Sequence, residues 1–92
     1  MPSTAVQYLQ PPKPVYPTFS RRAGETGRVQ IRVLIDERGQ PLKLELQRSS
    51  GFQRLDDSAL VAVRAAKFKP YTENGQPRSV WVLIPIVFDL EK

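Results

Sequence analysis

The side chains best suited to acid–base chemistry in this 92-residue chain are two adjacent pairs of carboxylates, Asp36-Glu37 and Asp56-Asp57. Neighbouring residues of a strand point to opposite faces, so Asp36 and Glu37 do not converge on one reacting atom. Asp56 and Asp57 precede an apolar helical pattern, and we expect one of them to cap that helix. The chain has no histidine, the usual general base near neutral pH, and no phosphate loop or nucleophile elbow. The sequence therefore predicts a protein that is not an enzyme.

Metal, cofactor and nucleic-acid binding are not expected either. Cysteine and histidine are both absent, which removes the thiolate and imidazole ligands of most zinc sites. The chain has 14 Lys and Arg against 9 Asp and Glu, a net charge of +5. These charges are dispersed, with Arg21-Arg22 as the only adjacent basic pair, so no basic stripe of the kind that marks nucleic-acid binding appears.

Proline separates the N-terminal part of the chain from the rest. Five of the nine prolines fall within the first 17 residues, where they favour extended backbone and remove hydrogen-bond donors. We expect residues 1–15 to be the end of a stiff Pro-rich linker, and residues 16–92 to form the domain. The start at Met1, directly before this run, suggests a fragment whose targeting segment lies upstream.

A short helix and a hairpin are predicted first. The helix covers Thr18–Ala23, with Thr18 or Ser20 as its cap and Gly24 at its end. Alternation of apolar and polar residues predicts a strand over residues 28–37, a turn containing Gly39, and a second strand over residues 42–47. The apolar residues expected to face the core are Val29, Ile31, Val33, Ile35, Leu42, Leu44 and Leu46.

A second helix and a last strand complete the prediction. The helix runs from Asp57 to about Lys67, with Leu60 and Val63 against the sheet and Phe68 entering the core beyond it. After the Asn74-Gly75 turn, the last strand covers residues 78–90. The predicted fold class is α+β, a small three-stranded antiparallel sheet packed by two helices in the order α-β-β-α-β.

The last strand carries two conflicting signals. It is apolar on both faces, which is typical of a central strand, yet it contains Pro85, which cannot donate to a ladder. One interpretation is an edge strand covered by a partner that adds a strand to the sheet. The other is that Pro85 only blocks unwanted edge pairing. An inward-pointing Pro85 nitrogen would mark a bulge, and an outward one would remove a donor from the free side.

The order of segments resembles the C-terminal domain of TonB proteins. Tyr16-Pro17 and GRVQIRVLIDERG are followed by RSSGFQRLDDSALVAVRAAKFKPY and then by VWVLIPIVF. The similarity covers residues 16–90, and its specificity lies in the order and spacing of these pieces together. Many members carry Trp before the Phe-x-Pro that ends the second helix, whereas this chain has Ala66 or Lys67 there.

The resemblance implies a binding and energy-transducing function. TonB proteins are anchored in the inner membrane by an N-terminal helix and cross the periplasm through a Pro-rich linker. ExbB and ExbD energise them with the proton gradient, and the last strand pairs with the TonB box of an outer-membrane transporter for uptake of iron-siderophore, haem or vitamin B12. For this chain the resemblance implies a periplasmic location in a Gram-negative bacterium, an anchor outside the given sequence, and no cofactor.

Residue by residue, the resemblance places the TonB-box contact on the last strand and a secondary contact just before the first helix. Lys13-Pro14 stands where members often have Gln-Pro, so a glutamine contact does not transfer. An exposed last strand also permits a homodimer. The alternative family is another envelope-spanning linker, resembling the TolA C-terminal domain, with a different periplasmic partner. The implied contact residues are Val80, Trp81, Val82, Leu83, Ile84, Pro85, Ile86, Val87, Phe88, Asp89 and Leu90, and secondarily Lys13, Pro14, Tyr16 and Pro17.

Overall fold

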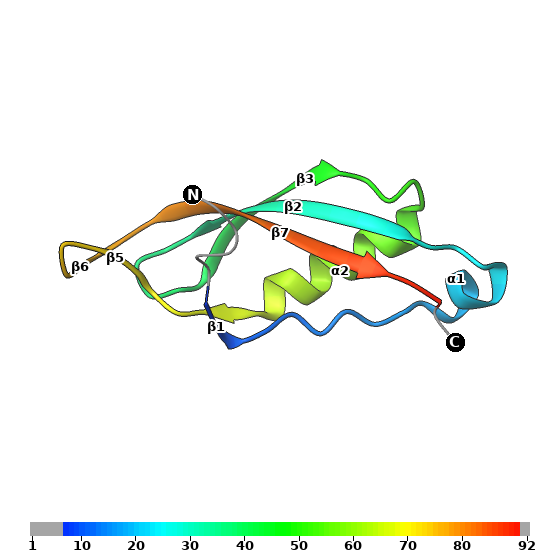
Figure 1. Ribbon diagram of the computed structural model, residues 1–92, viewed down its shortest axis with the longest axis horizontal. Helices are drawn as coiled ribbons and strands as arrows, with labels where there is room; N and C mark the ends of the chain where they lie inside the picture. Colours follow the sequence, from blue (N-terminus) through cyan, green and yellow to red (C-terminus); the bar gives the residue numbers. More distant parts are fainter. Residues whose placement is uncertain (1–6, 91–92) are drawn as a thin grey trace.

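A three-stranded antiparallel sheet forms one layer of the computed structural model, which describes residues 7–90, and one long helix covers a single face of that sheet (Figure 1). The strand order is β3 (Pro41–Arg48), β2 (Gly27–Ile35), β7 (Val80–Phe88), and the covering helix is α2 (Gln53–Ala65). A shorter helix, α1 (Thr18–Ala23), precedes β2. The predicted α+β class, with three antiparallel strands and two helices in the order α-β-β-α-β, is confirmed.

The β2–β3 hairpin closes through a turn organised by Asp36. Its Oδ1 accepts the backbone N–H groups of Arg38 and Gln40 at 2.8 and 2.9 Å. Gly39 has φ of 88°, a left-handed conformation that side chains other than glycine's adopt at a cost. Its carbonyl accepts the Phe68 N–H at 2.9 Å, so the tip of the hairpin is tied to the segment after α2.

The core lies between the sheet and α2, as the period of the strands requires. Alternate residues of β2 and β7 are buried, and from the helix side Leu55, Ala59 and Val63 are fully buried. Phe68 is also fully buried, as predicted. Leu60 is partly buried and packs against this core, as predicted. Leu42 and Leu46 are exposed, so the prediction that they face the core is wrong. β3 lies at the edge of the sheet and is more exposed than β2, whose core-facing residues are all buried.

Both the start and the end of α2 differ from the prediction of a helix from Asp57 to about Lys67. α2 begins after Phe52, which has no side-chain capping bond, and it ends at Ala65 because Ala66 is extended. Asp56 is therefore no cap. It lies in the first turn, where its buried carboxylate accepts hydrogen bonds from the Ser49 hydroxyl and from the Ser50 N–H and hydroxyl.

The start of α1 corrects a second capping prediction. Pro17 is its N-cap, without a side-chain bond, so neither Thr18 nor Ser20 has the predicted role. Gly24 ends the helix in a left-handed conformation, as predicted. The Ser20 side chain is instead fully buried.

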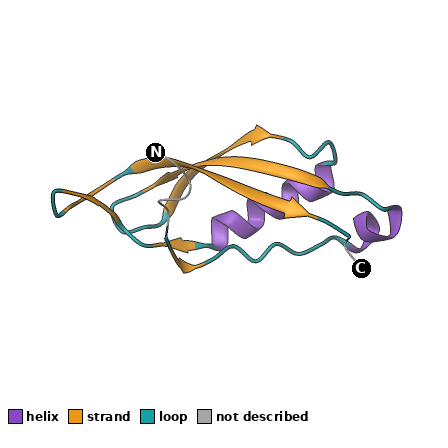
Figure 2. Cartoon of the chain, viewed as in Figure 1, coloured by secondary structure: helices purple, strands orange, loops and turns teal. Residues whose placement is uncertain are grey.

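Two short ladders extend the fold beyond the main sheet. β1 (Tyr8–Gln10) pairs with β4 (Lys67–Phe68), and β5 (Tyr71–Glu73) pairs with β6 (Gln76–Arg78) around the Asn74-Gly75 turn. The β5–β6 hairpin and α1 lie at opposite ends of a molecule 48 Å long (Figure 2).

The β1–β4 ladder bears on the expected linker. Tyr8, within residues 1–15, packs against Phe68 with ring centroids 5.2 Å apart and the rings tilted by 44°. The boundary at residue 15 stays a prediction, but part of the Pro-rich segment contacts the domain directly, and its residues 1–6 lie outside those that the structure describes.

We predict that Gly39→Ala lowers the free energy of unfolding by about 3 kcal/mol, because positive φ adds strain to a steric conflict. A Cβ at Gly39 would lie 1.9 Å from the Phe68 carbonyl oxygen. The matched control is Gly51→Ala, which has φ of 96° but open space around its Cβ and should cost only about 1–2 kcal/mol. Chemical denaturation measures both, and equal losses would contradict a role for the Phe68 contact.

We predict acid-dependent stability that depends on Asp56. Burial by itself raises the pKa of Asp56, but hydrogen bonds from Ser49 and Ser50 outweigh it and lower the pKa below the ordinary 3.8. A lowered folded-state pKa stabilises the fold above pH 3.8, and this contribution is lost as the pH falls through the folded pKa. Asp56→Asn should cost about 1–3 kcal/mol at pH 7 and flatten the loss of stability in acid. Urea unfolding at pH 3 to 7 tests this, with Asp57→Asn, an exposed neighbour, as the control.

Candidate partner-binding edge

β7 is an edge strand of the main sheet. It pairs with β2 on one side through nine consecutive residue pairs, from Ile35↔Val80 to Gly27↔Phe88. Among residues 7–90, no strand pairs with its other side. Predicted contact residues 80–88 thus all belong to one edge strand, while Asp89 and Leu90 follow its end. The predicted start at Arg78 is wrong, because Arg78 ends β6.

The two outer edges of the sheet differ in regularity. The β2–β3 pairing shifts register twice, and β3 carries Lys43, Glu45 and Arg48, all exposed. Bulges and charges are the usual protections of an edge against pairing. The β2–β7 pairing has no register shift, and β7 contains no charged residue. The edge of β7 is therefore the one suited to receive another strand.

The two faces of β7 have separate roles. Val82, Ile84, Ile86 and Phe88 are buried beneath α2 and belong to the core. On the opposite face of β7, Trp81 and Leu83 are half-buried, and Pro85 and Val87 are exposed. Both apolar faces predicted from the sequence are present, but only one is covered by the described part of the chain.

The orientation of Pro85 follows from the unbroken ladder. Pro85 lies opposite Gln30, and proline has no N–H to donate to it. In an antiparallel ladder, hydrogen-bonded and non-hydrogen-bonded pairs alternate, so a regular ladder accommodates Pro85 only at a non-hydrogen-bonded pair. Its nitrogen then faces the free edge, together with the N–H groups of Trp81, Leu83 and Val87. Of the two orientations considered from the sequence, the absence of a bulge favours the outward one.

Trp81 is held in place by a row of side chains across the sheet. The Arg32 guanidinium lies 3.9 Å from the centroid of the Trp81 ring, and its Nη1 lies 3.0 Å from Oε1 of Glu45. Each of these three residues comes from a different strand, on the face that α2 leaves open. Sequence reasoning singled out Trp81 but missed Arg32 and Glu45, although their place on the polar positions of two paired strands was the available signal.

The predicted secondary contact divides into exposed and structural residues. Lys13 and Pro14 are exposed, whereas Tyr16 and Pro17 are half-buried. The Tyr16 ring meets Phe88 of β7 edge-on, with centroids 5.3 Å apart, and its hydroxyl donates to the Glu25 carbonyl. Burial raises the pKa of Tyr16, and the Asp89 charge raises it further. Tyr16 thus joins the segment before α1 to the end of β7.

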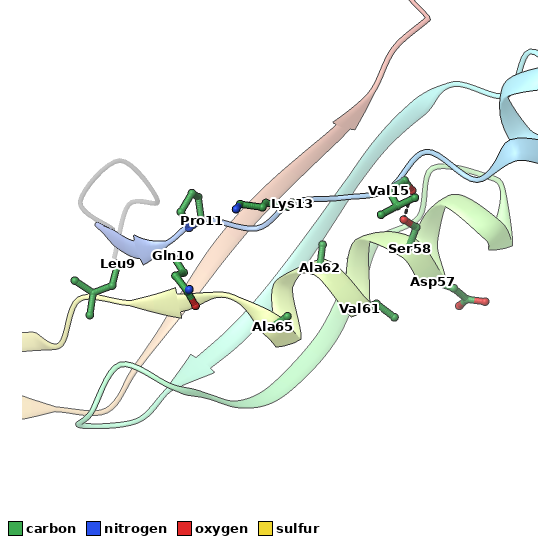
Figure 3. Close-up of a pocket in the computed structure, with 10 residues that line it drawn as sticks. All are labelled: Leu9, Gln10, Pro11, Lys13, Val15, Asp57, Ser58, Val61, Ala62 and Ala65. Carbon is green, nitrogen blue, oxygen red and sulfur yellow. Dashed lines mark hydrogen bonds between the residues drawn. The ribbon is translucent and has the colours of Figure 1, made fainter.

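A groove of about 620 Å³ lies between residues 9–15 and α2 (Figure 3). Leu9, Pro11 and Val15 form one wall, and Val61, Ala62 and Ala65 of α2 form the other. The Ser58 hydroxyl donates to the Val15 carbonyl and ties the two walls together. Lys13 lies beside this groove, so its position relative to the domain is defined although its side chain is exposed.

The α+β fold with its three-stranded antiparallel sheet and two helices agrees with comparisons to known proteins. The family described as Gram-negative bacterial TonB protein C-terminal matches residues 12–90. The chain belongs to this TonB C-terminal family. It is 37% identical over 89 residues to protein tonB2 of Pseudomonas aeruginosa, a match that covers 97% of this chain and 33% of that protein. It is 39% identical over 79 residues to protein TonB of Vibrio cholerae, covering 86% and 32% respectively.

A solved structure supports the TonB fold. The solution NMR structure of the Pseudomonas aeruginosa TonB CTD superposes with a TM-score of 0.79 at 23% identity, covering 95% of this chain and 88% of that one. The chain spans about a third of the length of the TonB relatives named above. The TonB C-terminal family is a non-enzymatic interaction family, in agreement with the expectation from the sequence.

Two further observations complete the description of this TonB domain. Within residues 7–90, none of the helices has both the length and the apolar character needed to cross a membrane. The same residues bring together no group of three or more acidic side chains that could hold a metal ion.

We predict that Tyr16 stabilises the fold and that Lys13 does not. Tyr16→Ala removes the packing on Phe88 and a hydrogen bond, and should lower the free energy of unfolding by about 2–4 kcal/mol. Lys13→Ala removes an exposed side chain and should change it by less than about 0.5 kcal/mol. Thermal unfolding of both variants measures this, and a stable Tyr16→Ala variant would contradict the structural role.

Proposed function

We propose that this domain binds the TonB box of an outer-membrane transporter by strand addition to the free edge of β7. The observation that carries the proposal is the edge itself, which is regular over nine residue pairs, apolar and free of charged residues. Exposed edges of this kind are normally protected, and the charged, irregular β3 edge of the same sheet has that protection. Family membership supports the partner class, because transporter binding is what the TonB family implies.

The added strand would be held mainly by its backbone. Trp81, Leu83 and Val87 offer outward N–H groups, and their carbonyls and that of Pro85 offer acceptors. Each hydrogen bond contributes only about 0.5–1.5 kcal/mol net, so the contact is expected to be reversible. Residues opposite these positions would point to the open face of the sheet, where Trp81 provides the largest apolar surface.

The wider role of the protein follows as part of the same proposal. The domain would act in the periplasm of a Gram-negative bacterium, joined through its Pro-rich segment to an inner-membrane anchor outside the given sequence. ExbB and ExbD would supply proton-gradient energy, and the force on the transporter would drive uptake of iron-siderophore, haem or vitamin B12. Lys13, Pro14 and the Tyr16-Pro17 pair would provide a secondary contact, with Lys13 and Pro14 as its accessible part.

The alternative from the sequence was a TolA-like envelope linker with a different periplasmic partner. The match to the TonB C-terminal family over residues 12–90 favours the TonB reading. Titration with a colicin-type or Tol partner in parallel with a TonB-box peptide distinguishes the two.

We predict that proline separates binding from folding along β7. Leu83→Pro removes an outward N–H and should leave the domain folded while lowering the affinity for a TonB-box peptide by about two- to twelvefold, the contribution of one hydrogen bond. Val82→Pro removes an N–H that bonds to β2 and should unfold the sheet. Leu83→Ala and Val82→Ala are the matched controls, because they shorten the side chain and keep the donor.

The measurements are the melting temperature and the amide chemical-shift titration of each variant. A folded Leu83→Pro domain that binds the peptide with wild-type affinity would move the contact away from this edge. The segment around Lys13 would then be the next candidate.

A further inference from the structure

We propose that Pro85 determines which strand the β7 edge accepts, disfavouring a second copy of this chain relative to a strand from another protein. This inference rests on the proposed function and concerns the same edge. Pro85 is the one interruption in the outward donor row of β7, which otherwise continues through Trp81, Leu83 and Val87.

The need for such a device follows from the composition of the edge. β7 has neither a charged residue nor a register shift against β2. Its outer positions are apolar, and the Val87 side chain is 56% exposed. A regular apolar edge strand is a template for its own twin as well as for a partner. Among the described residues of β7, Pro85 is the feature that opposes pairing.

Symmetry makes the effect of Pro85 unequal for the two kinds of partner. A dimer formed through this edge with a two-fold axis pairs the strands antiparallel, and each copy brings its own proline. The missing donor of Pro85 therefore occurs twice in the dimer. A partner strand without proline meets it only once. Each missing hydrogen bond lowers the association constant by about two- to twelvefold, so the dimer loses the square of the factor that the single partner strand loses.

The position of Pro85 also keeps this selectivity from harming the fold. Its nitrogen faces outward at the pair with Gln30, so the β2–β7 ladder is intact on either side, from Ile31↔Ile84 to Val29↔Ile86. At either neighbouring position, 84 or 86, the same ring would remove a bond to β2. At this position the proline therefore weakens association with another strand and does not weaken the β2–β7 ladder.

The test is Pro85→Ala in the 92-residue chain, with two association constants measured. Sedimentation equilibrium gives self-association, and amide-shift titration with a synthetic TonB-box peptide gives partner affinity. We expect peptide affinity to rise about two- to twelvefold and the dimer constant to rise by the square of that factor, about five- to 150-fold. No change in self-association, or a rise no larger than that for the peptide, would overturn the proposal.

Two control variants make the result specific. Pro77→Ala removes a proline from β6, away from this edge, and should change neither constant. The double variant Pro85→Ala/Val87→Pro moves the missing donor to another outward position and should return self-association to the wild-type level. If Pro85→Ala aggregates beyond a dimer, suppression by the double variant supports the proposal, and persistence of the aggregate contradicts it.

Failure of the proposed function would give a different pattern. The wild-type domain would then show no peptide-induced shifts on β7, yet Pro85→Ala would still dimerise more strongly. Failure of the further inference would leave peptide binding at β7 in place with no preferential rise in self-association. The two measurements therefore separate the hypotheses.

Discussion

The nine-pair ladder between β2 and β7 is the constraint on which the rest of the structure depends. Because it has no register shift, the alternation of side-chain direction and of backbone hydrogen bonding, which sets one phase, is unbroken along the whole length of β7. That phase directs Val82, Ile84 and Ile86 into the core and their backbone groups toward β2. It also directs the remaining backbone groups to the free edge and the side chains of Trp81 and Val87 to the open face. A slip by one residue would expose the core side chains and bury Pro85 in the ladder.

A second set of contacts holds the surrounding segments to this ladder. The Gly39 carbonyl at the tip of the β2–β3 hairpin accepts the N–H of Phe68, whose side chain lies in the core and packs against Tyr8 of β1. At the other end, Tyr16 packs on Phe88 and bonds to the carbonyl of Glu25. The N-terminal segment is thereby attached through β1 and through Tyr16. Between them it passes along α2 (Figure 1), where the Val15 carbonyl accepts the Ser58 hydroxyl.

Much of this arrangement could be predicted from periodicity. β2 alternates over nine residues, long enough for the period of two to be read, and α2 shows helical spacing. β7 is a continuous apolar run that follows the Asn74-Gly75 turn signal. The edge position of β7 was inferred from a conflict, because Pro85 interrupts a strand that is apolar on both faces. What could not be predicted depends on tertiary contacts. β1 and β4 have three and two residues, too few to show any period. Asp56 looked like a cap, but its partners are the serines of a turn whose path the core decides.

The candidate site was predicted better in its location than in its details. Residues 80–88 do form a free edge, yet the row through Arg32 that holds Trp81 requires knowledge of which strands pair. Likewise, Tyr16 was grouped with Lys13 because the two are close in sequence, and the fold separates them by burial. In an extended segment that packs against the domain with only one side, residues close in sequence can differ in exposure, as Lys13 and Tyr16 do.

The attachments of the N-terminal segment would respond differently to force under the proposed function. A pull on the chain before Gln7 first loads β1, whose ladder with β4 spans only two residue pairs. Such a short ladder opens at low cost, since each bond contributes about 0.5–1.5 kcal/mol. The load then reaches Val15, whose carbonyl accepts the Ser58 hydroxyl of α2, and next Tyr16, which contacts Phe88 at the end of β7 itself. The strand proposed to hold the transporter and the residue that receives the pull are thus in direct contact. The nine pairs between β7 and β2 distribute that load into the core, so the β1–β4 ladder yields before the sheet does.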